Sequence, residues 1–167
     1  GPSSRAVPPT VASKRVRRGA RVRSILVNAE ATARFRSLLA GPEADIPLDE
    51  AALLIAAQSD ASQTVAERLA RIDDLAATIE ATTAGDLGHT LFVERGIVGN
   101  TSDYGDPRTS FLHLVIDRRL GIPISMSVLM IEVGRRLGIG LYGIGMPGHF
   151  IVGVETEYAL GRALSDR

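Results

Sequence analysis

Residues 121–154 read GIPISMSVLMIEVGRRLGIGLYGIGMPGHFIVGV, and they carry the strongest structural signal in the chain. From Ser125 to Leu137 apolar side chains surround most of the circumference, and such a helix normally lies at the centre of a domain. Pro123 suits the start of this helix, because its missing N–H needs no partner there. Residues 139–145 and 149–154 then predict two strands joined by a turn at 146–148.

The part of the chain before this stretch predicts helices. Their expected ranges are 24–40, 50–58, 62–80, 86–95, and a further helix from Thr109 or Ser110 that closes near Gly121. Asp49 is expected to cap the second of them, and the third has the clearest amphipathic spacing. Residues 97–108 are predicted to form a loop. Helices followed by a hairpin indicate the α+β class.

Length and composition exclude several classes of protein. The 167 residues suit one domain with a sizeable core, and 45% hydrophobic with 23% charged residues is ordinary for a globular protein. The absence of Cys excludes disulfides, thiolate metal ligands and a cysteine nucleophile. No apolar run approaches the roughly 20 residues that span a bilayer. We therefore expect a cytoplasmic protein with no membrane contact, no cofactor and no metal.

The positive charges are concentrated near the N-terminus. Residues 1–23 carry seven Lys or Arg and no acid, whereas the rest of the chain carries 12 against 19 Asp and Glu. Gly1-Pro2-Ser3-Ser4 resembles the remnant of a cleaved expression tag, and the following residues are expected to form a flexible basic arm. One interpretation is that this arm binds nucleic acid or an acidic partner through Arg15, Arg17, Arg18 and Arg21. The simpler interpretation is a solvated tail.

Two residues of the segment 121–154 are candidates for catalysis. Ser125 lies in the first turn of the central helix, where the helix dipole favours developing negative charge. His149 begins the second strand, and an imidazole titrates near neutral pH. A serine at a helix start with a strand-borne histidine is one arrangement of a nucleophile and its base. The simpler interpretation of Ser125 is a cap. His89 and His113 fit packing or surface roles.

Five stretches of the chain carry a more specific signal in combination. They are IPLDEAALLI (46–55), YGDPRTSFL (104–112, after Asn100), DRRLGIPIS (117–125), EVGRRLG (132–138) and GMPGHF (145–150). Together they resemble the SirB-type family of transglutaminase-like proteins, over about residues 33–154. The resemblance implies a papain-like core, in which N-terminal helices and a central helix pack on a small antiparallel sheet. It makes 125–137 the nucleophile-bearing helix and His149 the family histidine.

The chain departs from that family at the catalytic positions. The cysteine position falls on Pro123 or Ser125, and in the former case no nucleophile remains. The acid expected on the next strand is missing, because the chain passes to Glu155 and then to a predicted helix at 157–164. We expect the fold to be incomplete at its C-terminus. The expected organisation is a basic arm at 1–23, a transglutaminase-like domain at 24–154 and a helical segment at 155–167.

Three functions remain open at this point. The first is a pseudoenzyme, a binding or regulatory module that has lost thiol chemistry and contacts a protein or peptide partner. The second is a hydrolase or acyl transferase that uses Ser125 and His149. The third is nucleic-acid binding through the basic arm. Fold alone does not decide between them.

Overall fold

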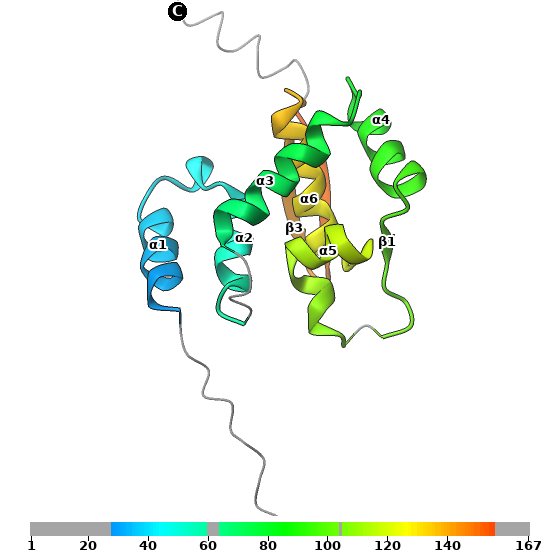
Figure 1. The fold of residues 1–167 in the computed structure, drawn as a ribbon. Helices are drawn as coiled ribbons and strands as arrows, with labels where there is room; N and C mark the ends of the chain where they lie inside the picture. Colours follow the sequence, from blue (N-terminus) through cyan, green and yellow to red (C-terminus); the bar gives the residue numbers. More distant parts are fainter. Residues whose placement is uncertain (1–27, 60–63, 104, 156–167) are drawn as a thin grey trace, which may run out of the picture.

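A computed structural model describes residues 28–59, 64–103 and 105–155 of the chain (Figure 1). The helices are α1 (Ala29–Leu39), α2 (Leu48–Ala56), α3 (Val65–Ala77), α4 (Ala84–His89), α5 (Leu112–Arg118) and α6 (Pro123–Arg136), with shorter helical turns η1 (Glu43–Asp45), η2 (Thr90–Glu94) and η3 (Pro107–Ser110). The strands are β1 (Val98–Gly99), β2 (Leu120–Gly121), β3 (Leu141–Met146) and β4 (His149–Val154). Helices with a small antiparallel sheet make the fold α+β.

The α6 helix lies at the centre of the domain, as the apolar stretch predicts. Figure 1 shows α3 and α5 on one side of α6 and β3 on the other, and α6 also contacts α2, α4 and β4. Leu129 and Val133 are completely buried in the main core cluster, which also takes Leu53, Ile72 and Leu87 from other helices. The apolar circumference of α6 is therefore explained by neighbours on several sides.

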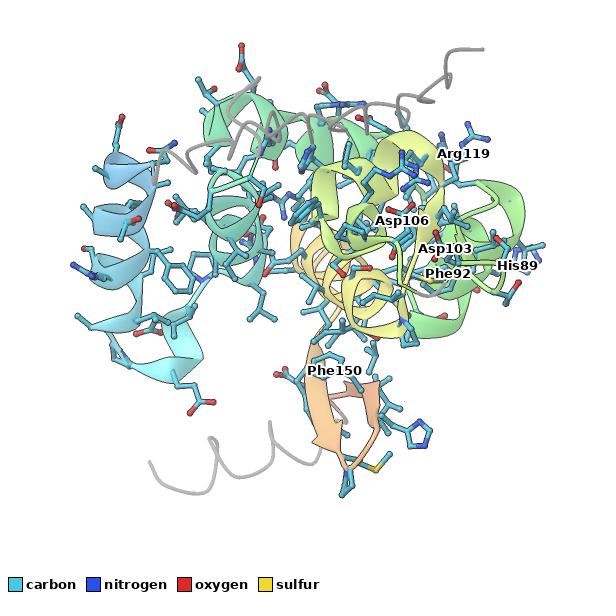
Figure 2. All side chains as sticks on the ribbon, turned by 90° about the horizontal axis from the view of Figure 1, so that it is seen from below. His89, Phe92, Asp103, Asp106, Arg119 and Phe150 are labelled. Atoms are coloured by element: carbon cyan, nitrogen blue, oxygen red, sulfur yellow. The ribbon has the colours of Figure 1, made fainter. Side chains whose placement is uncertain are left out.

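The hairpin of β3 and β4 packs on α6 through one face. The strands pair antiparallel, with Leu141 opposite Val154 and Met146 opposite His149. A Cβ added to Gly134 of α6 would lie 2.6 Å from Leu141 Cδ1, so a larger residue there would require the Leu141 side chain to move. Figure 2 places Phe150 on the side of the hairpin that faces the helices.

The structure corrects the expected secondary structure at two places. Within the predicted loop 97–108, Val98–Gly99 pairs in parallel with Leu120–Gly121, which ties this segment to the start of α6. Neither Thr109 nor Ser110 caps α5: both lie in η3, and Phe111 precedes the helix. Two-residue strands were missed because they are too short to show an alternating pattern.

Asp49 also differs from its expected role. The α2 helix begins at Leu48, two residues before the expected start at residue 50, and Pro47 occupies the capping position. The Asp49 side chain lies in the first turn, almost fully buried, and binds Arg136 of α6. The basic arm and the helix predicted at 157–164 lie outside the described residues. In the described parts of the chain, no helix combines the length and apolarity needed to cross a membrane.

Candidate functional site

A cleft of about 440 Å³ separates the first turn of α6 from the beginning of β4. Ile122, Pro123 and Ile124 line one wall, and residues 148–151 line the other. The lining is mainly apolar, and His149 is its titratable member. The large side chains of Ile124 and Ile151 remain 48% and 43% exposed. An open apolar cleft with one polar side chain is typical of a binding site.

His149 lies at the position that the hairpin pattern predicts. It is the first residue of β4, follows the turn residue Gly148, and is exposed at the mouth of the cleft. The nearest acid after β4 in the chain is Glu155, whose N–H donates to the Gly140 carbonyl at 2.9 Å. His149 and Glu155 are six residue steps apart along an extended chain, about 20 Å at 3.3 Å per step. Glu155 therefore does not orient the His149 ring.

Ser125 lies at the predicted position, but its hydroxyl bonds to main-chain groups. The residue is 5% exposed, and Oγ donates to the Thr109 carbonyl at 2.7 Å, with the Ile122 carbonyl at 3.1 Å. The same oxygen accepts the Ile122 N–H at 3.1 Å. These bonds hold η3 against the start of α6. Ser125 does not appear among the residues that line the cleft with His149. Catalytic roles for Ser125 and His149 remain predictions.

The carboxylate of Asp106 stabilises η3, the segment whose Thr109 carbonyl accepts a hydrogen bond from Ser125. Asp106 is 8% exposed and accepts hydrogen bonds from the Arg108 N–H at 3.0 Å, from Arg108 Nε at 2.8 Å and from Arg118 Nη2 at 3.0 Å. The hydrogen bond from the Arg108 side chain, with those from the Arg108 backbone and Arg118, holds the pKa of Asp106 far below its usual range. Thr109 Oγ1 donates to the Asp106 carbonyl at 2.7 Å. Asp106 thus links α5, η3 and, through Thr109, α6.

A second ionic cluster fastens the other end of α6. Arg136 donates to Asp49 at 2.7 Å and to Asp73 at 2.6 Å, and it also contacts Glu132 at 3.3 Å. Burial opposes its charge, but the hydrogen bonds to Asp73 and Asp49 raise the pKa of Arg136. Glu132 Oε1 accepts the Leu48 N–H at 3.0 Å and so caps the start of α2. This cluster joins α2, α3 and α6.

Apart from the cap expected at Asp49, the sequence predicts no role for these ionic residues. Asp49 and Arg136 are 87 residues apart in the chain, so no local pattern reveals their pairing. The available signal was that Asp49, Asp106, Arg118, Glu132 and Arg136 all lie within the five quoted stretches. These stretches therefore include the ionic residues that hold both ends of α6 in place, as well as His149 of the cleft.

Comparison with known proteins agrees with this architecture. The family model described as "Transglutaminase-like superfamily" matches residues 55–161, which include α6, the hairpin and the cleft. The chain belongs to the transglutaminase-like superfamily. No solved structure is a significant match to the chain.

Curated relatives of this transglutaminase-like chain include bacterial and mammalian proteins. A UPF0162 protein of Xylella fastidiosa is 52% identical over 67 residues, 40% of this chain and 24% of that protein. A UPF0162 protein of Pseudomonas aeruginosa is 34% identical over 130 residues, 72% of this chain and 48% of that protein. F-box only protein 21 of Mus musculus is 38% identical over 66 residues, 40% of this chain and 10% of that protein. The chain thus spans less than half the length of these relatives.

Proposed function

We propose that this transglutaminase-like domain is a non-catalytic binding or regulatory module of the SirB-type branch. Its binding surface is the cleft between α6 and β4, and the partner it accepts is an apolar peptide segment of another protein. The observation that carries the proposal is the contrast between the cleft and the Ser125 hydroxyl beside it. The cleft is open and apolar, whereas the hydroxyl nearest the family's nucleophile position is buried in bonds to the main chain.

Two further findings support a module without thiol chemistry. The chain contains no cysteine, so the nucleophile of a thiol transglutaminase is missing. Similar sequence also makes up a quarter of one bacterial protein and a tenth of a mammalian F-box protein. A stretch found in chains of such different length behaves as a unit that serves different larger proteins.

The cleft can be tested as an apolar binding surface with 8-anilinonaphthalene-1-sulfonate, which fluoresces when it binds apolar surface. We expect Ile124→Asp and Ile151→Asp each to weaken saturable dye binding by about fivefold, since each replaces part of the apolar wall. Val93→Asp is the matched control, because Val93 is 66% exposed on η2, outside the cleft. Equal effects of all three variants, or no effect of the two cleft variants, would exclude this surface.

The alternative function is a hydrolase or acyl transferase that uses Ser125 and His149. It is favoured by the position of His149 in the same cleft as the first turn of α6, whose helix dipole supports negative charge on Ser125. In that case the Ser125 hydroxyl has to leave the Thr109 carbonyl during the reaction. Covalent acylation of Ser125 distinguishes this function from the module. Nucleic-acid binding by the arm and a cytoplasmic location stay predictions.

A further inference from the structure

The cleft between α6 and β4 runs along an open edge of the hairpin. Residues 148–151 line it consecutively. Phe150 points to the face of the hairpin that meets the helices (Figure 2), so His149 and Ile151 point to the opposite face. A wall made by residues of both faces is the edge of a strand. Among the described residues β4 pairs with β3 alone, so this is the edge of β4 that faces away from β3.

Alternate residues of β4 turn their main-chain groups toward this edge. The Glu155 N–H donates to the Gly140 carbonyl at 2.9 Å, and the antiparallel register continues without a bulge up to the turn. Because residues of an antiparallel strand face their partner strand alternately, 149, 151 and 153 bond to β3. The N–H and C=O groups that point outward belong to Phe150, Val152 and Val154. No hydrogen bond within the described residues reaches these groups.

The edge also lacks the features that protect exposed strands from pairing. The β4 strand reads HFIVGV, which contains neither a charged residue nor a proline. Edge strands are commonly protected by lysine, proline or a bulge, because an open row of N–H and C=O groups pairs readily with another chain. This edge is therefore free to accept one more strand.

The opposite wall of the cleft offers apolar contact. Pro123 has no N–H, and the Ile122 N–H donates to Ser125 Oγ at 3.1 Å. The Ile122 carbonyl accepts the Met126 N–H at 3.0 Å. The Ile124 side chain is 48% exposed. One wall of the cleft thus provides main-chain donors and acceptors, and the other provides apolar side chains.

We propose that the partner binds in this cleft as a single extended segment that pairs with β4 as a third strand. The inference rests on the proposed function of the cleft and adds the form of its partner. Main-chain hydrogen bonds to Phe150 and Val152 would supply affinity, and side chains against Ile124 would supply selectivity. No Asp, Glu, Lys or Arg of the described chain lines the cleft, which favours an uncharged segment. Because the α6 wall faces the edge, one extended chain fits there, whereas a second copy would bring its two-stranded hairpin.

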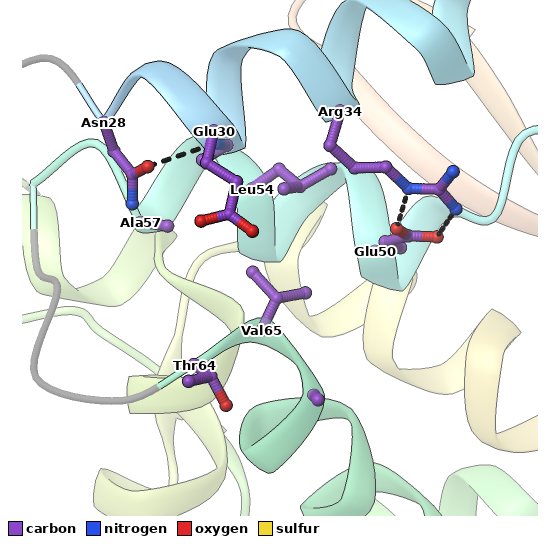
Figure 3. Close-up of a pocket in the computed structure, with 10 residues that line it drawn as sticks. Asn28, Glu30, Arg34, Glu50, Leu54, Ala57, Thr64 and Val65 are labelled. Carbon is purple, nitrogen blue, oxygen red and sulfur yellow. Dashed lines mark hydrogen bonds and ion pairs between the residues drawn. The ribbon is translucent and has the colours of Figure 1, made fainter.

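A second pocket of the described chain does not share these features. It lies between α1, α2 and the start of α3 (Figure 3), and helices rather than a strand form its walls. Its Arg34 and Glu50 already pair with each other, with Nε–Oε1 2.6 Å. The backbone amides of Ala31 and Ala57, which line this pocket, therefore serve as reference signals.

The first test uses acetyl-Val-Thr-Val-Thr-Val-amide as the probe and the amide signals of Phe150 and Val152 by NMR in the full chain. One derivative carries N-methyl groups on its valines and another carries them on its threonines, so each loses the donors of one edge of the peptide. We expect saturable shifts with the unmodified peptide and none at Ala31 or Ala57. One derivative should bind about tenfold more weakly and the other about equally well, since one edge of the peptide bonds to β4.

The second test removes a donor from the edge itself. Val152→Pro deletes an outward N–H and keeps the hydrogen bonds to β3, a position that strands allow for proline. Its matched control is Gly145→Pro, because Gly145 lies opposite Phe150 and turns its N–H to the other edge of the hairpin. A Cβ at Gly145 meets nothing within 4 Å. We expect Val152→Pro alone to weaken peptide binding, by about fivefold. The methylated peptides test the proposal even if Val152→Pro does not fold.

The outcomes separate this inference from the proposed function. Peptide binding that is equal for both methylated derivatives, or absent, would overturn pairing with β4. If dye binding still depends on Ile124 and Ile151 in that case, the apolar cleft stands and only the form of its partner is wrong. Shifts of Phe150 and Val152 that follow protein concentration without peptide would make a second copy the occupant and would also overturn the proposal.

Discussion

At the scale of single residues, the start of α6 is held by hydrogen bonds between side chains and main chain. Ser125 satisfies the buried Thr109 carbonyl and the Ile122 N–H, and Thr109 in turn bonds to the Asp106 carbonyl. The Asp106 carboxylate in turn accepts hydrogen bonds from the Arg108 and Arg118 side chains. Ser125, the predicted nucleophile, therefore has a structural role, because its hydroxyl joins η3 to the start of α6.

Replacement of Ser125 by alanine should destabilise the domain by about 1–3 kcal/mol, because it leaves a buried carbonyl and an N–H without partners. Ser127→Ala is the matched control on the same helix, since Ser127 is also buried but has no hydrogen bond of its hydroxyl among the described residues. Urea denaturation of the two variants measures the difference. If both variants lose the same free energy of unfolding, the link through Ser125 contributes nothing.

Asp106 should make stability depend on pH in the acid range. Its pKa is lowered in the folded state by the hydrogen bonds from Arg108 and Arg118, so the unfolded chain takes up the proton first as the pH falls. Its contribution is therefore complete above the ordinary aspartate pKa of about 4 and declines below it. The difference in unfolding free energy between wild type and Asp106→Asn should be constant from pH 5 to 8 and shrink at pH 3.

The same measurement on Asp45→Asn provides the control, because Asp45 is an exposed aspartate of η1. The expected difference for this variant is small at every pH. A difference for Asp106→Asn that stays constant down to pH 3 would contradict the assigned ionic role.

At the scale of elements, two ionic clusters fix α6 at opposite ends. The Asp106 cluster joins its first turn to η3 and α5, and the Arg136 cluster joins its last turn to α2 and α3. Asp49 and Glu132 are nearly fully buried, so their charges depend on Arg136 for compensation. Removal of one partner from such a cluster is costly, because the remaining charges stay buried.

Arg136→Leu should therefore lower the free energy of unfolding by about 3–5 kcal/mol. Arg36→Leu is the control, because Arg36 is exposed on α1 and surface changes stay within about 0.5 kcal/mol. Thermal and urea denaturation of both variants measure the effect. An Arg136 variant as stable as the Arg36 variant would mean that Arg135, which also contacts Asp49 and Glu132, is sufficient for the cluster.

At the scale of the whole molecule, the sequence predicted the order of the elements because their signals are local. The apolar circumference of 125–137 predicted the central helix, and the glycine and proline turn predicted the hairpin. The hairpin pattern placed His149 at the start of the second strand, and the resemblance to transglutaminase-like proteins paired it with the central helix; in the structure His149 and the first turn of α6 line the same cleft. Partners far apart in the chain, such as Asp49 with Arg136, could not be predicted, because a single sequence does not show which distant charges meet.

The domain has the transglutaminase-like architecture, and we propose that it uses its cleft for binding. The most direct test of this proposal is the intact mass of the full chain, and of its Ser125→Ala variant, after incubation with a fluorophosphonate, which phosphonylates reactive serines and releases fluoride. We expect no adduct on either protein, since the Ser125 hydroxyl is engaged with the Thr109 carbonyl. An adduct on the wild type that is absent from Ser125→Ala would contradict the account and assign the domain to serine chemistry.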